Sequence, residues 1–211
     1  MRPAETPSIL VIKLSALGDM VQALGPFATI RRHHPEARIV LLTTRPYVAF
    51  TQASGYFDEV WTDARPRWNR PGDWLALRRK LREGGFARVY DLQTSDRSSS
   101  YFRLFWPGPY PEWSGIARGG SHPHANPERD RMHTVDRQAE QLRMVGIDHV
   151  EAPDLSWVTA DTARFGLPER YALLAPGGAA HRPEKRWPAG RYGELANWMV
   201  RNGMTPVLLG T

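Results

Sequence analysis

The 211-residue sequence contains no cysteine. This absence excludes disulfide bonds and thiolate metal sites, and it is typical of proteins in a reducing compartment. No apolar run approaches the ~20 residues that a membrane-spanning helix needs, and the first eight residues lack the basic and apolar regions of a secretory signal. Together these absences predict a cytoplasmic location.

Two glycine-rich phosphate motifs are also missing. The sequence has no G-x-x-x-x-G-K-[ST] loop, and no G-x-G-x-x-G follows its first apolar run. The second motif binds the pyrophosphate of dinucleotides. Its absence argues against a nicotinamide-dependent oxidoreductase, which is one alternative for a chain of this kind.

Lysine is scarce, with three lysines against 25 arginines. The net charge of +6 favours anionic partners, and it permits a second alternative, a non-catalytic protein that binds polyanions or nucleic acid. An ammonium is not interchangeable with a planar guanidinium where geometry matters. Two of the lysines, Lys13 and Lys185, lie in the loops described below, which makes them candidate functional residues.

Residues 1–160 alternate between apolar runs and segments of helical spacing. We expect strands at Ile9–Lys13, Arg38–Thr43, Glu59–Trp61, Arg88–Leu92 and Glu112–Ile116. We expect helices from Asp19 to about Ile30 and at Pro46–Ser54, Asp73–Glu83, Ser95–Phe105 and His133–Val145, with 118–131 as a loop. This alternation predicts an α/β domain with a doubly wound, Rossmann-like parallel sheet.

The pattern starts again after a linker at about residues 148–160. A strand at Tyr171–Ala175, a helix at Ala189–Asn202 and a strand at Pro206–Leu209 are expected. A β-α-β unit of this size is too small to bury a stable core alone. We therefore interpret 161–211 as the incomplete beginning of a second Rossmann-like domain, and we expect the 211 residues alone to be inactive.

The stretch Ile9–Pro26 forms a strand, a tight turn and a helix, with Lys13 and Asp19 on either side of the turn. The carboxyl end of such a strand is where open α/β sheets bind ligands. A structural interpretation is also available, because Asp19 and Gln22 fit a D-x-x-Q capping box at a helix start. Spacing alone does not choose between a cap and a catalytic carboxylate.

The loop between Ala175 and Ala189 reads PGGAAHRPEKRWP. Gly177 and Gly178 allow the backbone to turn sharply and to approach a ligand closely. Lys185 and Arg186 add positive charge beside a helix N-terminus, which suits a diphosphate. An ordinary strand-to-helix connection with surface charges is the alternative.

Both stretches resemble signatures of glycosyltransferase family 9, the lipopolysaccharide heptosyltransferases. Lys13, Ser15, Gly18 and Asp19 match its K-x-S-x-x-G-D motif. The run from Ala175 to Ala179, followed by Lys-Arg-Trp-Pro at 185–188, resembles its H-P-G-A…K-R-W-P pattern. The resemblance implies a GT-B fold of two Rossmann-like domains and an inverting transfer of a heptose or related sugar from an ADP-sugar.

The resemblance also implies roles for individual residues. Asp19 would be the catalytic base, and Lys185 would contact the diphosphate of the ADP-sugar. The implied donor-binding residues are Lys13, Gly177, Gly178, His181, Lys185 and Arg186. Ala180 and His181 replace the Ser or Thr that family members often place before the lysine, which could change the donor preference. The ADP-sugar is a co-substrate, and no cofactor or metal is expected.

The implied acceptor is an anionic glycolipid, which would bring the protein to the inner-membrane surface as a peripheral monomer that does not bind nucleic acid. The expected acceptor-binding residues are Ser15, Arg65, Arg67, Arg70 and Arg97. We expect Arg78, Arg79 and Arg82 to form a solvated helix face. Three histidines in or near the polar loop, His122, His124 and His133, are expected to be exposed rather than to bind a metal.

Overall fold

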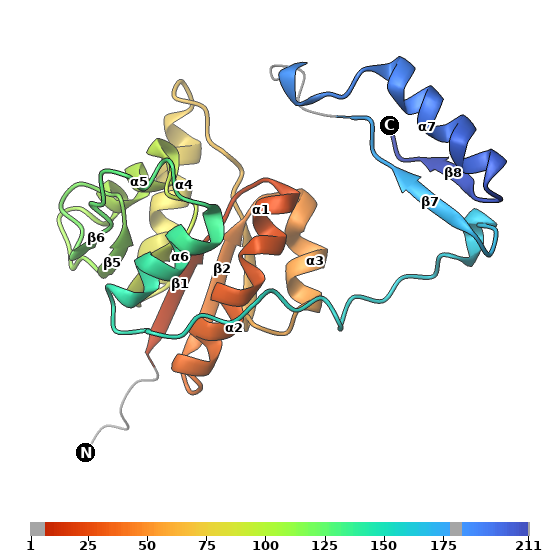
Figure 1. Cartoon of the computed structure of the whole chain (residues 1–211). Coiled ribbons are helices and arrows are strands. Elements are labelled where there is room, and N and C mark those ends of the chain that lie inside the picture. The colour runs from red at the N-terminus through yellow and green to blue at the C-terminus, as the bar shows by residue number, and fades with distance from the viewer. Residues whose placement is uncertain (1–6, 178–182, 211) are drawn as a thin grey trace. The chain divides into compact units, whose positions relative to one another are not determined.

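The computed structural model describes residues 7–177 and 183–210 and contains two compact units (Figure 1). The first unit ends at Val158 and the second begins at Thr159. None of the helices in the described part of the chain is long and apolar enough to cross a membrane.

The first unit is built on a six-stranded sheet in which every neighbouring pair is parallel, in the order β3-β2-β1-β4-β5-β6. This sheet confirms the predicted α/β fold with a Rossmann-like parallel sheet. The strands are β1 (Ser8–Ile12), β2 (Arg38–Thr43), β3 (Glu59–Thr62), β4 (Phe86–Asp91), β5 (Glu112–Gly115) and β6 (His122–Pro123).

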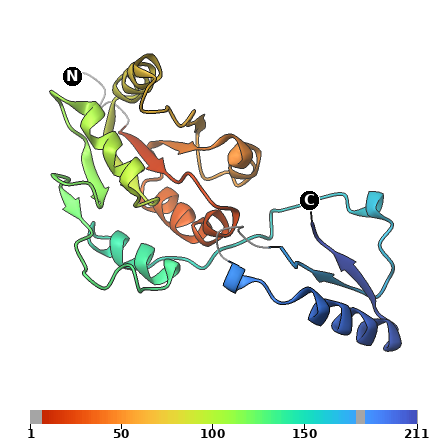
Figure 2. The ribbon, with the colours of Figure 1, turned by 90° about the horizontal axis from the view of Figure 1, so that it is seen from above.

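Helices cover both faces of this sheet because the central strand is apolar on both faces. Ile9 and Val11 pack into the core on one face, and Leu10 and Ile12 pack into the core on the other. Figure 2 shows the helices on both sides of the sheet. The helical elements are α1 (Leu17–Gln22), α2 (Leu24–His33), η1 (Arg45–Tyr47), α3 (Val48–Ala53), α4 (Pro71–Glu83), α5 (Asp96–Ser100), η2 (Tyr101–Phe105) and α6 (Thr134–Arg143).

The strand order places a topological switch point between β1 and β4. From β1 the chain builds outward through β2 and β3, and it then crosses back to form β4 on the other side of β1. The loops that follow β1 and β4 therefore leave the sheet in opposite directions. Open α/β sheets bind ligands in the crevice that forms at this position.

Several elements differ from the sequence-based expectation. The first helix begins at Leu17 rather than at Asp19, and the chain forms two helices, α1 and α2, that meet at Ala23. The expected helix at Ser95–Phe105 is α5 followed by the 3-10 turn η2. The segment 118–131, expected to be a loop, contains the two-residue strand β6, which pairs with β5.

The arginines of α4 also differ from the expected solvated face. The Arg78 Nη2 donates to the carbonyl oxygen of Trp106 at 2.6 Å. The Arg82 guanidinium donates to the carbonyls of Phe105, Trp106 and Gly108. Arg78 and Arg82 therefore hold the turn at 105–108 against α4. Arg79 and Arg82 are exposed as expected, whereas Arg78 is half-buried.

The second unit contains the two parallel strands β7 (Tyr171–Leu174) and β8 (Thr205–Leu208), joined through α7 (Ala189–Arg201). Two short 3-10 turns, η3 (Ala163–Phe165) and η4 (Pro183–Lys185), complete it. Large apolar side chains of this unit are well exposed, including Trp198 at 55% and Leu208 at 66%.

A close approach of another backbone segment to Gly25 predicts that one added methyl group destabilises the first unit. A Cβ on Gly25 of α2 would lie 2.0 Å from the carbonyl oxygen of Glu151, in the segment that follows α6. This segment is fixed to α2, since the Glu151 N–H donates to Thr29 Oγ1 at 3.0 Å. Gly25→Ala should therefore lower the free energy of unfolding by about 1–3 kcal/mol, measured by chemical denaturation.

The control for this change is Gly72→Ala in the first turn of α4. A Cβ on Gly72 would meet nothing within 4 Å. Because alanine favours helix over glycine, this variant should be neutral or up to about 1 kcal/mol more stable. Equal stability of the Gly25→Ala and Gly72→Ala proteins would show that the segment at 151 does not pack on α2 in solution.

Candidate active site at the switch point

The turn after β1 is held in place by side chains from the neighbouring strands. The Gln93 Oε1, just after β4, accepts hydrogen bonds from the backbone N–H groups of Leu14 at 2.8 Å and Ser15 at 3.2 Å. On the other side, Thr44 Oγ1 after β2 donates to the Leu14 carbonyl at 2.7 Å. The turn is thus fixed at the carboxyl edge of the sheet.

Asp19 lies half-buried in the first turn of α1, at the end of this fixed turn. Its Oδ2 accepts a hydrogen bond from the Ala16 N–H at 3.1 Å. The alternative interpretation, an Asp19–Gln22 capping box, is wrong: Ala16 occupies the N-cap position, and Asp19 is the third residue of the helix. A carboxylate accepts more hydrogen bonds than this one, so the structural bond does not prevent Asp19 from meeting a ligand.

Lys13 is buried directly beneath the turn, with only 3% of its surface exposed. Its Nζ donates to the Leu92 carbonyl oxygen at 3.3 Å. Burial lowers the pKa of Lys13, and attraction to the Asp19 and Asp91 carboxylates opposes this effect. The Lys13 ammonium is therefore kept away from solvent, close enough to two acidic residues for their charges to affect its pKa.

Asp91 ends β4 and is completely buried. It pairs with Ile12 across the β1–β4 ladder, so it lies one position from Lys13 at the switch point. Its Oδ1 accepts a hydrogen bond from the Thr94 N–H at 3.1 Å. Burial raises the pKa of Asp91 to about 7, although the Thr94 bond and the nearby Lys13 act in the opposite direction.

Two of the expected acceptor residues meet at this edge. The Arg65 Nη2 donates to Ser15 Oγ at 3.2 Å and connects the turn after β1 with the loop after β3. The backbone of Arg65 has a φ of +50°, which is uncommon for a residue other than glycine. This conformation is supported by a hydrogen bond from its N–H to Asp63 Oδ1 at 2.8 Å.

The other three arginines lie around the same loop. The Arg97 Nη1, in α5, donates to the Pro66 carbonyl at 3.4 Å. Arg67 and Arg70 are exposed between β3 and α4. The loop is anchored from below by the buried Asp63, whose Oδ2 accepts a 2.7 Å hydrogen bond from Tyr101 Oη. The fold therefore places four arginines in or against the loop that Arg65 connects to Ser15.

The expected donor loop lies in the second unit and is described only in part. Gly178 and His181 lie outside the described residues, as does the side chain of Lys185. Gly177 and Arg186 are exposed. After the loop, the Trp187 and Tyr192 rings pack edge to face with centroids 5.0 Å apart, and Tyr192 Oη donates to the Ala175 carbonyl at 3.3 Å.

The histidines of the polar loop show mixed environments. His124 is buried rather than exposed, and its Nε2 lies 3.3 Å from Glu140 Oε1. His122 Nδ1 is hydrogen-bonded to Ser121 Oγ, and His133 is the N-cap residue of α6. Within residues 7–177 and 183–210, no group of three or more His, Asp or Glu side chains could hold a metal ion.

The sequence did not predict roles for Asp91 and Gln93, which follow one another closely at the end of β4. The signal for Asp91 was a carboxylate at the end of an apolar strand, in the run RVYDL. Gln93 gives no such signal, because its role depends on β4 pairing with β1. Gln141 of α6 completes this region by donating to the Asp91 carbonyl at 3.1 Å.

Comparison with protein families gives one match. The model of glycosyltransferase family 9 (heptosyltransferase) matches residues 74–211. This range includes the loop at 175–189 and excludes the turn after β1, so the match and the K-x-S-x-x-G-D motif are separate observations. A search of curated proteins found no match.

Solved structures with the same fold include a family 9 glycosyl transferase from Veillonella parvula DSM 2008, with a TM-score of 0.77 and 21% identity over 97% of this chain and 62% of that one. The ADP-heptose LPS heptosyltransferase II of E. coli gives a TM-score of 0.67 and 20% identity over 97% of this chain and 64% of that one. E. coli heptosyltransferase WaaC with ADP-2-deoxy-2-fluoro heptose gives a TM-score of 0.65 and 19% identity over 97% of this chain and 69% of that one. The chain thus spans less than two thirds of the first two structures.

The buried Asp91 predicts a distinctive dependence of stability on pH. Its pKa is about 7 in the folded protein and about 4 in an unfolded chain. Between these values the folded state keeps a proton that the unfolded state has released, so the free energy of unfolding should fall as the pH rises. One such proton contributes at most about 1.4 kcal/mol per pH unit.

Asp91→Asn should remove this contribution. Denaturation at about pH 5 and about pH 7.5 should therefore show a smaller loss of stability in the variant than in the parent protein. Asp96→Asn, at an exposed position in the first turn of α5, should leave the loss unchanged. If Asp91→Asn and the parent protein have the same pH dependence, Asp91 titrates normally and is not buried as described.

Proposed function

Because the chain belongs to glycosyltransferase family 9, the heptosyltransferases, we propose that it forms part of an inverting glycosyltransferase. The observation that carries this proposal is the position of Asp19, half-buried at the start of α1 beside the switch point. A rigid turn presents this carboxylate at the sheet edge where ligands bind in open α/β folds.

In the proposed reaction, an acceptor hydroxyl attacks the anomeric carbon of the donor sugar. Asp19 takes the hydroxyl proton as the new C–O bond forms. The bond between the anomeric carbon and the diphosphate breaks at the same time, and the electron pair leaves with the diphosphate. Attack from the face opposite the leaving group inverts the anomeric configuration.

The surroundings of Asp19 fit an anionic acceptor. Arg65 is bonded to Ser15 Oγ, four residues before Asp19, and Arg97 reaches the same loop. Arg67 and Arg70 add exposed positive charge nearby. We propose that these groups bind the phosphates or carboxylates of a glycolipid, by charge-assisted hydrogen bonds. Such an acceptor would place the protein at the cytoplasmic surface of the inner membrane.

We further propose that the donor is an ADP-sugar, with a heptose as the first candidate. Two observations support this donor. The family match covers the loop at 175–189, and one structure with the same fold is described as an ADP-heptose LPS heptosyltransferase. Gly177, Gly178, His181, Lys185 and Arg186 would contact the diphosphate. Lys13, buried beneath the turn, would add positive potential without direct contact.

The role of Asp19 is tested by a substitution that keeps its structural bond. Asparagine also has a side-chain oxygen that can accept from the Ala16 N–H, so Asp19→Asn should leave the melting temperature nearly unchanged. It cannot take a proton, and general-base catalysis contributes typically about 10²–10⁴-fold. We expect kcat to fall by a factor of this order, measured with ADP-sugar and acceptor in the full-length protein that contains this chain.

Asp73 provides a matched control, because it occupies the same third position in α4 that Asp19 occupies in α1. Asp73→Asn should keep normal turnover. Asp19→Ala should lose activity and also about 1 kcal/mol of stability through the lost hydrogen bond. Near-normal turnover of Asp19→Asn would show that Asp19 has only a structural role.

The donor role of Lys185 is tested by ADP affinity. Lys185→Ala in the full-length protein should weaken ADP binding by about 1.5–3 kcal/mol, as for a charge-assisted hydrogen bond, and Lys185→Arg should recover only part of the loss. The control is Lys80→Ala, which removes the same charge from α4, where Lys80 Nζ lies 4.7 Å from the centre of the Trp61 ring. Unchanged affinity in calorimetry of Lys185→Ala would exclude the proposed contact.

A further inference from the structure

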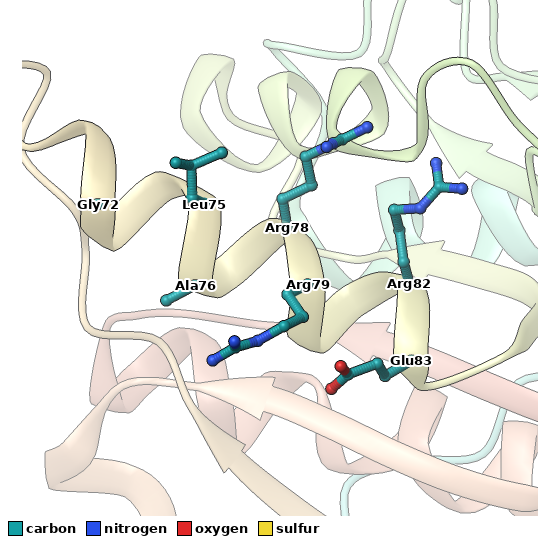
Figure 3. Close-up of a pocket in the computed structure, with 7 residues that line it drawn as sticks. All are labelled: Gly72, Leu75, Ala76, Arg78, Arg79, Arg82 and Glu83. Atoms are coloured by element: carbon teal, nitrogen blue, oxygen red, sulfur yellow. The ribbon is translucent and has the colours of Figure 1, made fainter.

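The solvent side of α4 carries a shallow depression of about 590 Å³ (Figure 3). None of the residues that line it belongs to the candidate active site. We call this surface the α4 outer face. Its lining residues are Gly72, Leu75, Ala76, Arg78, Arg79, Arg82 and Glu83.

The α4 outer face is predominantly positive. Its lining contains three arginines and one carboxylate, that of Glu83. In Figure 3 the Arg78 and Arg82 side chains extend to one side of the helix, and Arg79 and Glu83 extend to the other. The cationic groups therefore spread over the width of the face instead of forming one compact cluster.

Two large apolar side chains are exposed here: Leu75 lines the depression, and Trp106 belongs to the turn that Arg78 and Arg82 bind. Leu75 is 62% exposed in the middle of α4. Trp106 is 67% exposed, and it is held beside α4 because its carbonyl accepts hydrogen bonds from both Arg78 and Arg82. The apolar positions of α4 that pack on the sheet, Leu77 and Leu81, are buried. Leu75 and Trp106 thus have no part in the core.

The combination of exposed Trp, Leu and Arg fits one environment better than any other. At a membrane surface, Trp and Leu insert into the headgroup region while long cationic side chains reach anionic lipid headgroups. A nucleic-acid backbone would use the arginines but would give an exposed leucine no favourable contact. The charge of the face is complementary to anionic lipids.

We propose that the α4 outer face docks the protein on an anionic lipid surface, with Leu75 and Trp106 inserted among the headgroups and Arg79 near the lipid phosphates. This docking rests on the proposed function, because a lipid-linked acceptor requires the enzyme to work at a membrane. The residues of the α4 outer face are distinct from the arginines of the candidate acceptor site.

The test measures sedimentation of the protein with vesicles that contain no donor and no acceptor. We expect binding to vesicles with phosphatidylglycerol, little binding to pure phosphatidylcholine vesicles, and weaker binding as salt rises. Arg79→Gln and Leu75→Ser should each reduce the partition coefficient by roughly five-fold, since one cation or one buried leucine is lost from the contact.

Two control variants remove the same groups from other exposed positions. Arg143→Gln removes an arginine from the last turn of α6, and Leu155→Ser removes a leucine that is 44% exposed. Both should bind vesicles as the parent protein does. The proposal would be overturned if the control variants lost as much vesicle binding as the α4 variants. It would also be overturned if the protein bound phosphatidylcholine vesicles as well as vesicles with phosphatidylglycerol.

Two further measurements distinguish a lipid-docking face from an acceptor site and from a nucleic-acid surface. In the full-length protein, Arg79→Gln and Leu75→Ser should keep normal turnover on a water-soluble acceptor, so that a loss of vesicle binding is not a loss of the enzyme. If turnover on the soluble acceptor falls with them, the face belongs to the acceptor site instead. Tighter binding to duplex DNA than to anionic vesicles, unchanged by Leu75→Ser, would assign the face to nucleic acid and contradict the proposal.

Discussion

The first unit depends on the burial of β1 on both faces and along both edges. Its five residues are all buried, and they pair in parallel with β2 on one side and β4 on the other. Its aliphatic side chains divide between the two cores. The turn that leaves this strand is fixed by Gln93 and Thr44. The candidate site is therefore rigid because the sheet is rigid.

The same constraint explains the electrostatics of the site. The parallel pairing of β1 with β4 places Lys13 one position from Asp91 below the surface, where water cannot solvate either group. Burial lowers the pKa of Lys13 and raises that of Asp91 to about 7. Opposite charges in such a position offset part of the cost of burying each other. Asp19, one turn above, remains half-buried and accessible.

The sequence predicted the elements whose signal is local. The run RIVLLT is apolar throughout, and β2 has the predicted bounds. The predicted start of α1 was wrong because Ala16, not Asp19, occupies the N-cap position. Asp19 is the third residue of the helix, and its side chain accepts a hydrogen bond from the Ala16 N–H. An aspartate that acts from inside the helix looks the same in sequence as one at its start. Strand β6 was missed because it has two residues in a polar loop and exists only through its pairing with β5.

The candidate site residues also divide into those with a local sequence signal and those that depend on contacts between distant segments. Asp19 and Ser15 could be found because a short motif carries them. Asp91 and Gln93 depend on contacts between β1 and β4, which are about 80 residues apart in the sequence, as the 79-residue separation of Lys13 and Leu92 illustrates. The arginines of α4 look alike in sequence, and only the distant turn at 105–108 distinguishes Arg78 and Arg82 from Arg79.

The stereochemistry of the product tests the account most directly. The full-length protein would be mixed with an ADP-sugar and an acceptor, and the anomeric proton of the product would be followed by NMR. The account predicts release of ADP and a product whose anomeric configuration is opposite to that of the donor, because one carboxylate acting as a base supports a single displacement. A product with retained configuration, or a product formed without release of ADP, would contradict it.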